Sequence, residues 1–339
     1  MRLVLFVNDV ATEVDEYTTT RLAVAASRLE HEVFYVGAGD VRYRSGDTIR
    51  ARAHVARHSE GDDLTSFLER VQEEDSEQVI DLAEADVVFL RNDSIEDLHE
   101  RPWAFNSGSD FGMMLVARGV TVLNDPEGLT RASSKLYLEE FPERIRPRSL
   151  VSRDLDEIKA FVEETGPSVL KPLYGAKGRN VFIIDDGEDP NLAQMIEAVL
   201  EDGYVLAQER VEGAEDGDLR LFLLDGEPLR SAGAYAAFRR IPRGGDPRAN
   251  ISAGGKPVEA EIGKRELAVV DAMSERLRRD GMFFVGLDMI GDKVVEVNAE
   301  SPGGLQAVEH FTGVDFAPIV IEALERKAGA SPGRLRSIG

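Results

Sequence analysis

Apolar runs and amphipathic segments alternate along the first third of the chain. Residues 3–7 form an apolar run that predicts a buried strand, and residues 17–29 place Leu22, Ala26 and Leu29 on one helical face. The same criteria predict strands at 31–36, 86–90 and 120–123, a hairpin over 41–55, an acidic helix before residue 86 and a helix over 103–118. Strands that alternate with helices favour a doubly wound, mostly parallel sheet over residues 1–123.

The pattern changes after Asn124-Asp125-Pro126, where antiparallel pairing begins to dominate. A helix bearing Lys135 is expected first, followed by strands at 149–152, 168–173, 180–184, 205–209, 283–290 and 293–298, helices at 155–165, 262–280 and 315–327, and a hairpin turn at 225–228. The sequence therefore predicts an α/β domain over 1–123, two α+β units over 124–204 and 205–330, and a frayed tail over 331–339.

Composition narrows the function classes. A chain of 339 residues with 42% hydrophobic content can bury a sizeable core, and its length favours two or three lobes. The formal charge of -23 disfavours nucleic acid and anionic lipid as partners, and an acidic surface also suits a salt-rich cytoplasm. The absence of cysteine excludes thiolate metal sites and cysteine nucleophiles. The apolar run at 3–7 is too short for a signal peptide or a membrane span, so a cytoplasmic enzyme is expected.

One hairpin in the last unit carries the strongest chemical signal. A turn at residues 291–293 predicts three facing pairs: Ile290 with Val294, Asp288 with Glu296, and Gly286 with Asn298. Opposed carboxylates in an apolar hairpin repel each other unless a cation compensates them, and hard oxygen ligands suit Mg²⁺. The alternative is a solvated edge hairpin with incidental acids.

A second signal is a lysine at the end of a strand, followed by a short glycine loop. Lys171 precedes Gly175 and Gly178, and glycines allow backbone N–H groups to approach a phosphate whose charge the lysine would neutralise. By itself such a loop is more often an exposed turn with a solvated lysine, and only the other motifs favour the phosphate site. Neither a P-loop motif nor a dinucleotide-binding fingerprint is present.

A third signal is an aperiodic segment, residues 241–257, rich in glycine, arginine and proline. Arginines lie in it or beside it at positions 220, 239, 240, 243 and 248. The planar guanidinium suits carboxylate and phosphate, and such a loop can close over a site to exclude water. A solvated basic loop is the alternative.

These clusters, in this order, resemble the prokaryotic glutathione synthetases, which are ATP-grasp ligases. The resemblance spans most of the chain to about residue 327, and its motifs include Ser134-Lys135-Leu136, Leu170-Lys171-Pro172-Leu173, Asp216-Gly217-Asp218 with Arg220, Arg240-Ile241-Pro242, Arg248 with Asn250, and Glu296-Val297-Asn298 followed by Ser301-Pro302. It implies an ATP-grasp fold, in which a doubly wound N-terminal domain precedes two α+β subdomains that enclose ATP.

The resemblance also implies roles for individual residues. The nucleotide would be held by Lys135, Lys171, Gly175, Gly178, Gln208, Glu209, Arg210, Val211 and Asp218. The reacting carboxylate and phosphoryl group would face Arg220, Arg240, Arg248 and Asn250. The metal ligands would be Asp288, Glu296 and Asn298, and the substrate loop would comprise Ser301, Pro302 and Gly303.

The implied reaction passes the γ-phosphoryl group of ATP to a substrate carboxylate, and an amine then attacks the acyl phosphate to form an amide. In glutathione synthetases the substrates are γ-glutamylcysteine and glycine. The cofactors implied are ATP and Mg²⁺, with two ions expected and Mn²⁺ as a substitute. The partners implied are amino-acid or peptide substrates and further copies of the chain, with no nucleic acid or membrane.

Departures from the family pattern concern the substrate side. Gly303-Gly304-Leu305 stands where the family has Thr and then Ile-Arg-Glu, Lys177 replaces a glycine, and Arg91-Asn92-Asp93-Ser94 replaces Lys-Asp-Pro-Pro. A related ligase with another amino-acid or peptide substrate, similar to the glutamate-adding and ribosomal-protein-modifying enzymes, is therefore a second hypothesis. A third is a non-catalytic nucleotide-binding protein.

Overall fold

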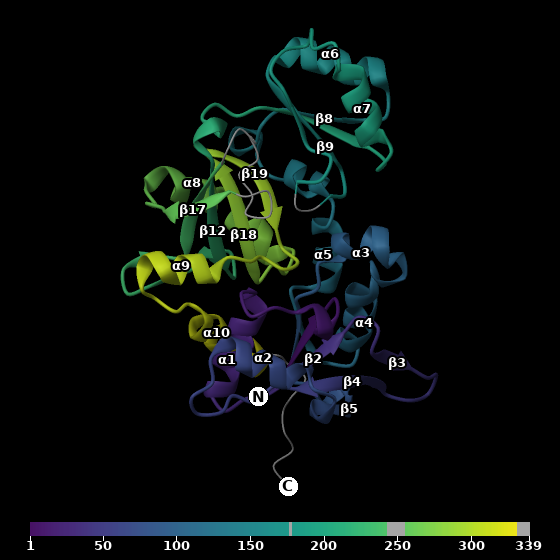
Figure 1. Cartoon of the computed structure of the whole chain (residues 1–339), viewed down its shortest axis with the longest axis vertical. Coiled ribbons are helices and arrows are strands. Elements are labelled where there is room, and N and C mark those ends of the chain that lie inside the picture. Colours follow the sequence, from purple (N-terminus) through teal and green to yellow (C-terminus); the bar gives the residue numbers. More distant parts are fainter. Residues whose placement is uncertain (176–177, 243–254, 331–339) are drawn as a thin grey trace.

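The computed structural model describes residues 1–175, 178–242 and 255–330. In these residues three sheets follow one another along the long axis of the molecule, with a two-stranded ribbon, β14 (Arg230–Ser231) and β15 (Ala234–Tyr235), beside them. Figure 1 shows the small sheet with helices α6 and α7 at one end, the N-terminal sheet at the other, and the large sheet between them.

The N-terminal sheet is doubly wound, as predicted. Its parallel strands are β1 (Arg2–Val7), β2 (Glu32–Gly37), β6 (Val87–Leu90) and β7 (Thr121–Leu123), and the hairpin of β3 (Val41–Tyr43) and β4 (Ile49–Val55) continues it antiparallel. Leu3 and Leu5 pack on the side of α1 (Thr18–Arg28), whereas Val4 and Phe6 pack on the side of α4 (Ser107–Val116). Alternate side chains of one strand thus enter two cores.

The acidic helix expected before residue 86 is wrong in part. Helix α2 (Leu64–Gln72) ends early, and the acidic stretch after it forms an edge strand, β5 (Glu77–Asp81), which pairs with β4. Three of its five residues are exposed, so the strand lacks the apolar alternation that would reveal it in the sequence. Charged edge strands also resist pairing with other molecules.

The small sheet is antiparallel, in the order β10 (Phe182–Ile184), β9 (Ser168–Pro172), β11 (Val205–Glu209) and β8 (Ser149–Ser152). Helices α6 (Leu155–Thr165) and α7 (Leu192–Leu200) cover one face, where Ile158 and Ile196 pack against Leu170 and Ala207. Strand β11 is hydrogen-bonded to β9 and β8 on its two sides. The predicted boundary at 204/205 is therefore misplaced, because it would cut this strand from the sheet it completes.

The large sheet has the order β17 (Lys256–Glu259), β16 (Ala237–Ile241), β12 (Asp218–Leu224), β18 (Phe284–Ile290) and β19 (Lys293–Asn298), with β13 (Glu227–Pro228) paired to β12. Leu221 and Leu287 share a core with Met273 and Leu277 of α8 (Lys264–Arg279). The residues that alternate with them, Arg220 and Asp288 among others, point to the opposite face. One face of the sheet is thus core, and the other is free to carry charge.

The N-terminal sheet and the large sheet share a core. The side chain of Asn124, 1% exposed, accepts hydrogen bonds from the N–H groups of Phe283 and Phe284 at 2.7 and 2.8 Å and donates to the carbonyl oxygens of Phe284 and Ala299. Helix α9 (Leu305–Thr312) follows the large sheet, and α10 (Ala317–Ala330) returns to pack on α1 (Figure 1). The end of the described chain therefore closes onto its beginning.

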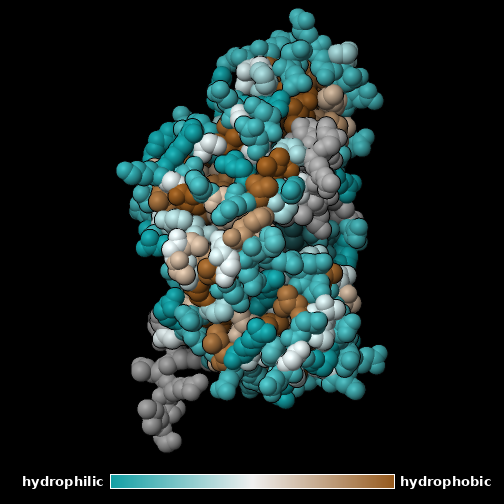
Figure 2. Space-filling view, turned by 60° about the vertical axis from the view of Figure 1, so that its left-hand side comes forward, coloured by the Kyte–Doolittle hydropathy of each residue, from teal (hydrophilic) through white to brown (hydrophobic). Residues whose placement is uncertain are grey.

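The surface agrees with the acidic composition. Figure 2 shows a face that is mostly hydrophilic, with hydrophobic residues in separate groups. Within the described ranges, no helix has the length and apolar character needed to span a bilayer.

A buried acid and a buried base lie beneath the junction of the N-terminal sheet with the loop after β19. Glu13 and Arg91 are 8% and 2% exposed, and Arg91 lies over the rings of Phe89 and Phe284. Burial raises the pKa of Glu13 to about 7, with a further contribution from Glu96, although Arg91 opposes the shift. Glu13 therefore gives up its proton less readily in the folded protein than in the unfolded chain.

This shift predicts a pH-dependent stability difference for Glu13→Gln. Between about pH 4.5 and pH 7 the folded wild type retains the proton that the unfolded chain loses, so its free energy of unfolding falls as the pH rises. The glutamine variant lacks this loss and should gain up to about 3 kcal/mol relative to wild type by pH 8. Denaturant melts at pH 5 and pH 8 measure it, with Glu16→Gln, an exposed neighbour, as control. An equal difference at both pH values would contradict the shift.

Candidate functional site

A cavity of about 600 Å³ is lined by the small sheet, the large sheet and residues of the N-terminal domain that lie outside its strands. Every predicted site residue that lies within the described ranges lines it: Lys135, Lys171, Gly175, Gly178, Gln208, Glu209, Arg210, Val211, Asp218, Arg220, Arg240, Asp288, Glu296, Asn298, Ser301, Pro302 and Gly303. Arg248, Asn250 and most of the predicted lid 241–257 lie outside the described residues. Residues that are up to 168 positions apart in sequence, such as Lys135 and Gly303, thus share one chamber.

Alternating charges cross the open face of the large sheet from strand to strand. Asp218 faces Arg240 on β16, and Arg220 faces Asp288 on β18. The guanidinium of Arg240 donates to both oxygens of Asp218 at 2.7 Å and lies 2.7 Å from Asp288 Oδ2. Arg220 binds Asp288 through Nε and through Nη2, the latter at 2.8 Å. Asp288 is thus held between two arginines.

Burial and these ion pairs act in opposite directions on the acids. Asp288 is 1% exposed, and burial alone would raise its pKa, but Arg220 and Arg240 outweigh this and hold the pKa well below its usual range. The pKa of Asp218 is raised by burial and by the nearby charge of Asp288. Burial disfavours the charge of Arg240, yet Asp288 and Asp218 keep its pKa above the ordinary value. Asp288 therefore stays ionised inside the protein.

Close packing on this face requires a glycine beside Arg220. A Cβ atom on Gly286 would lie 3.0 Å from Arg220 Cδ and 3.2 Å from Pro302 Cβ. The guanidinium can lie along the strand toward Asp288 only because that space is empty. Gly286 thus belongs to the packing of the site although it offers no side chain.

The hairpin keeps two of its three predicted pairs. Asp288 faces Glu296 and Gly286 faces Asn298, as expected, but the pairing of Ile290 with Val294 is wrong. A β-bulge makes Met289 the partner of Val294 and Ile290 the partner of Lys293, so that Val295 is the extra residue. Its carbonyl oxygen lies 3.3 Å from Lys171 Nζ. The bulge thus offers an acceptor to a lysine from the small sheet.

The donor atoms of the hairpin suit a hard divalent cation. Asp288 and Glu296 supply carboxylate oxygens, and the Asn298 amide lies beside them, with its nitrogen 3.2 Å from Asp288 Oδ2. In the described part of the chain, no three His, Asp or Glu side chains gather closely enough to hold a metal by themselves. Mg²⁺ takes one or two carboxylates together with waters and substrate phosphate oxygens, so this donor set fits it.

Two lysines reach the cavity from the side of the small sheet. Lys171 Nζ donates to Gln208 Oε1 at 2.9 Å, and Lys135 Nζ donates to the carbonyl oxygen of Gly175 at 2.5 Å and lies 3.9 Å from Glu296. Burial lowers the pKa of Lys171 to about 8, although Glu296 opposes the shift, and it also lowers the pKa of Lys135. An anionic ligand placed between them would favour the charged forms of both lysines.

The same side of the cavity offers an apolar wall and a polar strand end. Val169, Ile183 and Leu206 line it, and Glu209 to Val211 continue from β11. Gln208, 3% exposed, is fixed by Lys171 and by Ser149. An apolar wall beside exposed backbone groups can accept a flat heteroaromatic ring.

The opposite end of the cavity contains residues that the sequence analysis left out. Asp93 and Glu300 line it and lie in contact, and burial, followed by the charge of Asp93, raises the pKa of Glu300 to about 8. Tyr17, Ile95 and Gly304 line the same end. Two features of the sequence could have indicated these residues. One is the acid Glu300, between Asn298 and Ser301-Pro302, and the other is the altered segment around Asp93.

Two protein-family domains match consecutive parts of the chain. Residues 1–130 match the prokaryotic glutathione synthetase, N-terminal domain, and residues 134–313 match the prokaryotic glutathione synthetase, ATP-grasp domain. The chain belongs to the prokaryotic glutathione synthetase family. The resemblance inferred from the motifs is confirmed, and with it the ATP-grasp fold and the class of ATP-dependent C–N ligases.

Relatives that carry the name glutathione synthetase match over nearly the whole length. Those of Vibrio parahaemolyticus and Synechocystis sp. are 30% and 32% identical and cover 90% and 91% of this chain and 92% and 94% of their own length. That of Synechococcus elongatus is 39% identical over 60% of this chain and 61% of its own.

Solved structures agree in fold at low sequence identity. The D-cycloserine synthetase DcsG has a TM-score of 0.66 at 15% identity, covering 96% of this chain and 99% of its own. The ATP-grasp ligase PsnB, solved with a minimal precursor, Mg and ADP, has a TM-score of 0.60 at 18% identity, covering 96% and 98%. These likenesses concern the fold alone.

Lys171→Met should weaken ATP binding by about 10- to 100-fold, since a charge-assisted hydrogen bond contributes about 1.5–3 kcal/mol. The fold should persist because the change removes a buried charge. In the wild type, ATP affinity should fall as the pH rises through about 8, where Lys171 loses its proton, and this dependence should disappear in the variant. Calorimetric titration measures both, with the exposed Lys264→Met as control. Equal affinity in the variant and wild type would refute the role of Lys171.

Proposed function

We propose that the chain joins γ-glutamylcysteine to glycine with cleavage of ATP to ADP and phosphate. One observation carries the proposal: the hairpin acids, the two lysines and the two arginines line one cavity in a member of the prokaryotic glutathione synthetase family. The nucleotide would lie between Lys135, Lys171 and the β11 end. The substrate carboxylate would lie toward Arg220, Arg240 and the 301–303 loop.

The residues divide the work by charge. Lys135 and Lys171 would hold the phosphates, and the bound anion would counteract the lowering of their pKa values by burial. Arg220 joins the hairpin to the substrate loop, because its Nη1 atom lies 3.3 Å from the carbonyl oxygen of Gly303 while Nε and Nη2 bind Asp288. Arg240 would offset charge that develops on the transferred phosphoryl group. Water must be kept out so that the acyl phosphate meets only the amine.

The metal ligands in this proposal are Asp288, Glu296 and Asn298. When bound there, Mg²⁺ would neutralise phosphate charge and polarise the phosphoryl group. We further propose that two ions bind and that Mn²⁺ can substitute for Mg²⁺.

Four other properties are also proposed. The protein is cytoplasmic and homo-oligomeric, its N-terminal domain binds substrate, and its small sheet closes over the nucleotide.

A second candidate function is ligation of a different amino acid or peptide. It is favoured by the substrate end, where Gly303-Gly304 and the segment Arg91-Asn92-Asp93-Ser94 depart from the family pattern. An ADP-release assay with γ-glutamylcysteine plus glycine, and then with pooled amino acids and γ-glutamyl peptides, separates the candidates. Release with the first pair supports the proposal, and release only with another pair supports the second candidate. No substrate-stimulated release would leave a nucleotide-binding protein.

Glu296→Gln should reduce turnover by at least about a hundredfold while the melting temperature changes little, because it removes metal-binding charge without changing shape. The matched control is Asp292→Asn, which removes a carboxylate that is 54% exposed at the turn of the same hairpin and should leave turnover intact. Steady-state ADP release measures both. Activity of Glu296→Gln near that of the control would rule out the metal assignment.

A further inference from the structure

The loop between β19 and α9, residues 299–304, receives hydrogen bonds from the N-terminal domain. Ser94 donates to Glu300 twice, from its hydroxyl at 2.6 Å and from its backbone N–H at 2.8 Å. Arg91 Nη2 donates to the carbonyl oxygen of Pro302 at 3.1 Å. Ser94 and Arg91 are 5% and 2% exposed, so these bonds form inside the protein, where water competes weakly.

The large sheet also holds this loop, because Arg220 Nη1 lies 3.3 Å from the carbonyl oxygen of Gly303. Just after the loop, the N–H of Leu305, at the start of α9, lies 3.4 Å from Thr18 Oγ1 of α1, a further contact with the N-terminal domain. Consecutive residues of the loop therefore contact different domains. Both domains therefore determine the shape of the cavity wall that this loop forms.

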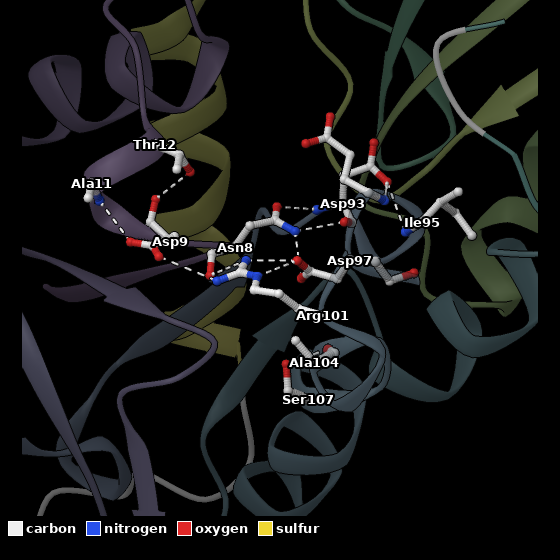
Figure 3. Close-up of polar contacts among 12 residues, drawn as sticks. Asn8, Asp9, Ala11, Thr12, Asp93, Ile95, Asp97, Arg101, Ala104 and Ser107 are labelled. Atoms are coloured by element: carbon white, nitrogen blue, oxygen red, sulfur yellow. Dashed lines mark hydrogen bonds and ion pairs between the residues drawn. The ribbon is translucent and has the colours of Figure 1, made fainter. Parts of the chain in front are cut away.

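A polar network fixes the segment that presents Ser94. Asn8, at the end of β1, donates to the carbonyl oxygen of Asp93 at 2.7 Å and accepts from its N–H at 2.8 Å. Asn8 also binds Asp97, which in turn accepts from Arg101 Nε at 2.8 Å. Figure 3 shows this network running from Asn8 through Asp97 to Arg101, with Asp93 beside it. The backbone at 93–94 is thus locked from within its own domain.

Both hydrogen bonds to Glu300 come from donors of Ser94 itself, its hydroxyl and its N–H. Ser94 lies in the altered segment Arg91-Asn92-Asp93-Ser94, and Glu300 lies immediately before Ser301-Pro302. A proline at position 94 could donate neither of the two bonds, since it lacks both a hydroxyl and an N–H. The contact therefore pairs Ser94, from the segment that departs from the family pattern, with Glu300 in the other domain.

We propose that Ser94 is a positioning residue. Through its hydrogen bonds to Glu300, the N-terminal domain holds the loop 299–304 in the conformation that substrate binding requires. Arg91 supports it through Pro302. The proposal rests on the proposed function, because it assigns this end of the cavity to the substrate. The positioning role concerns only the substrate end of the cavity. The nucleotide end, where Lys135, Lys171 and Gln208 lie, is on the small-sheet side.

The test compares Ser94→Ala with a matched control, Ser152→Ala. Ser152 is 7% exposed and donates to Glu157 at 2.7 Å in the small sheet, away from the cavity lining, so it offers an equally buried serine–glutamate bond. Ser94→Ala should raise KM for the carboxylate substrate about tenfold and leave KM for ATP unchanged. Ser94→Thr, which retains the hydroxyl, should restore the wild-type KM, and the control should match wild type.

A second measurement needs no turnover. Hydrogen exchange of the peptide covering 299–305, in the full chain without ligands, should be faster in Ser94→Ala than in wild type and unchanged in Ser152→Ala. If Ser94→Ala does not fold, Glu300→Gln, which keeps the shape but can accept only one of the two bonds, replaces it. An unchanged hydrogen-exchange rate in this loop would contradict the proposed role of the Ser94–Glu300 hydrogen bonds. Faster exchange with no change in substrate KM overturns the positioning role alone.

The two proposals can fail separately. If γ-glutamylcysteine elicits no ADP release, the KM comparison uses whichever substrate does, and the exchange result stands without any. A rise of both KM values together, for substrate and for ATP, would mean that Ser94 serves general stability and would overturn the proposal.

Discussion

The structure of the site depends on a buried carboxylate held between two guanidinium groups. Asp288 stays ionised at 1% exposure because Arg220 and Arg240 compensate it from the neighbouring strands. Removing one partner of such a pair typically costs about 3–5 kcal/mol, since the remaining charge is left buried alone. The three residues must therefore be retained together. Their pairing fixes the relative register of β16, β12 and β18 on the face where the chemistry is proposed.

The charged face is possible because the opposite face of the same strands is apolar. Leu221 and Leu287 pack on α8, so the alternation of each strand separates structural from functional side chains. The β-bulge in β19 adds one residue, Val295, whose carbonyl oxygen meets Lys171 from the small sheet. Contacts of this kind bring together the parts of the cavity proposed to hold the nucleotide and the metal, although different sheets supply them.

The side of the cavity proposed for the substrate is organised differently. Its wall is a loop held by the N-terminal domain, and the bonds from Ser94 and Arg91 reach it across the domain junction. Enzymes of one fold change substrate most readily where loops line the site, because a loop can vary without disturbing the sheets that carry the common chemistry.

The sequence by itself determined the order of most strands, the family and many of the residues that line the cavity, because these reside in local periodicity and in short motifs such as Leu170-Lys171-Pro172. The prediction that Asp288 faces Glu296 is also correct, although the turn is one residue shorter than expected and the bulge at Val295 restores this pair. The tertiary structure decided what local patterns cannot encode. It placed β11 in the small sheet and β5 at an edge, introduced the bulge at Val295, and brought Ser94 onto Glu300 across 206 positions of chain. Each of these depends on which distant segment supplies the partner, and that choice is made when the apolar faces of whole sheets pack together.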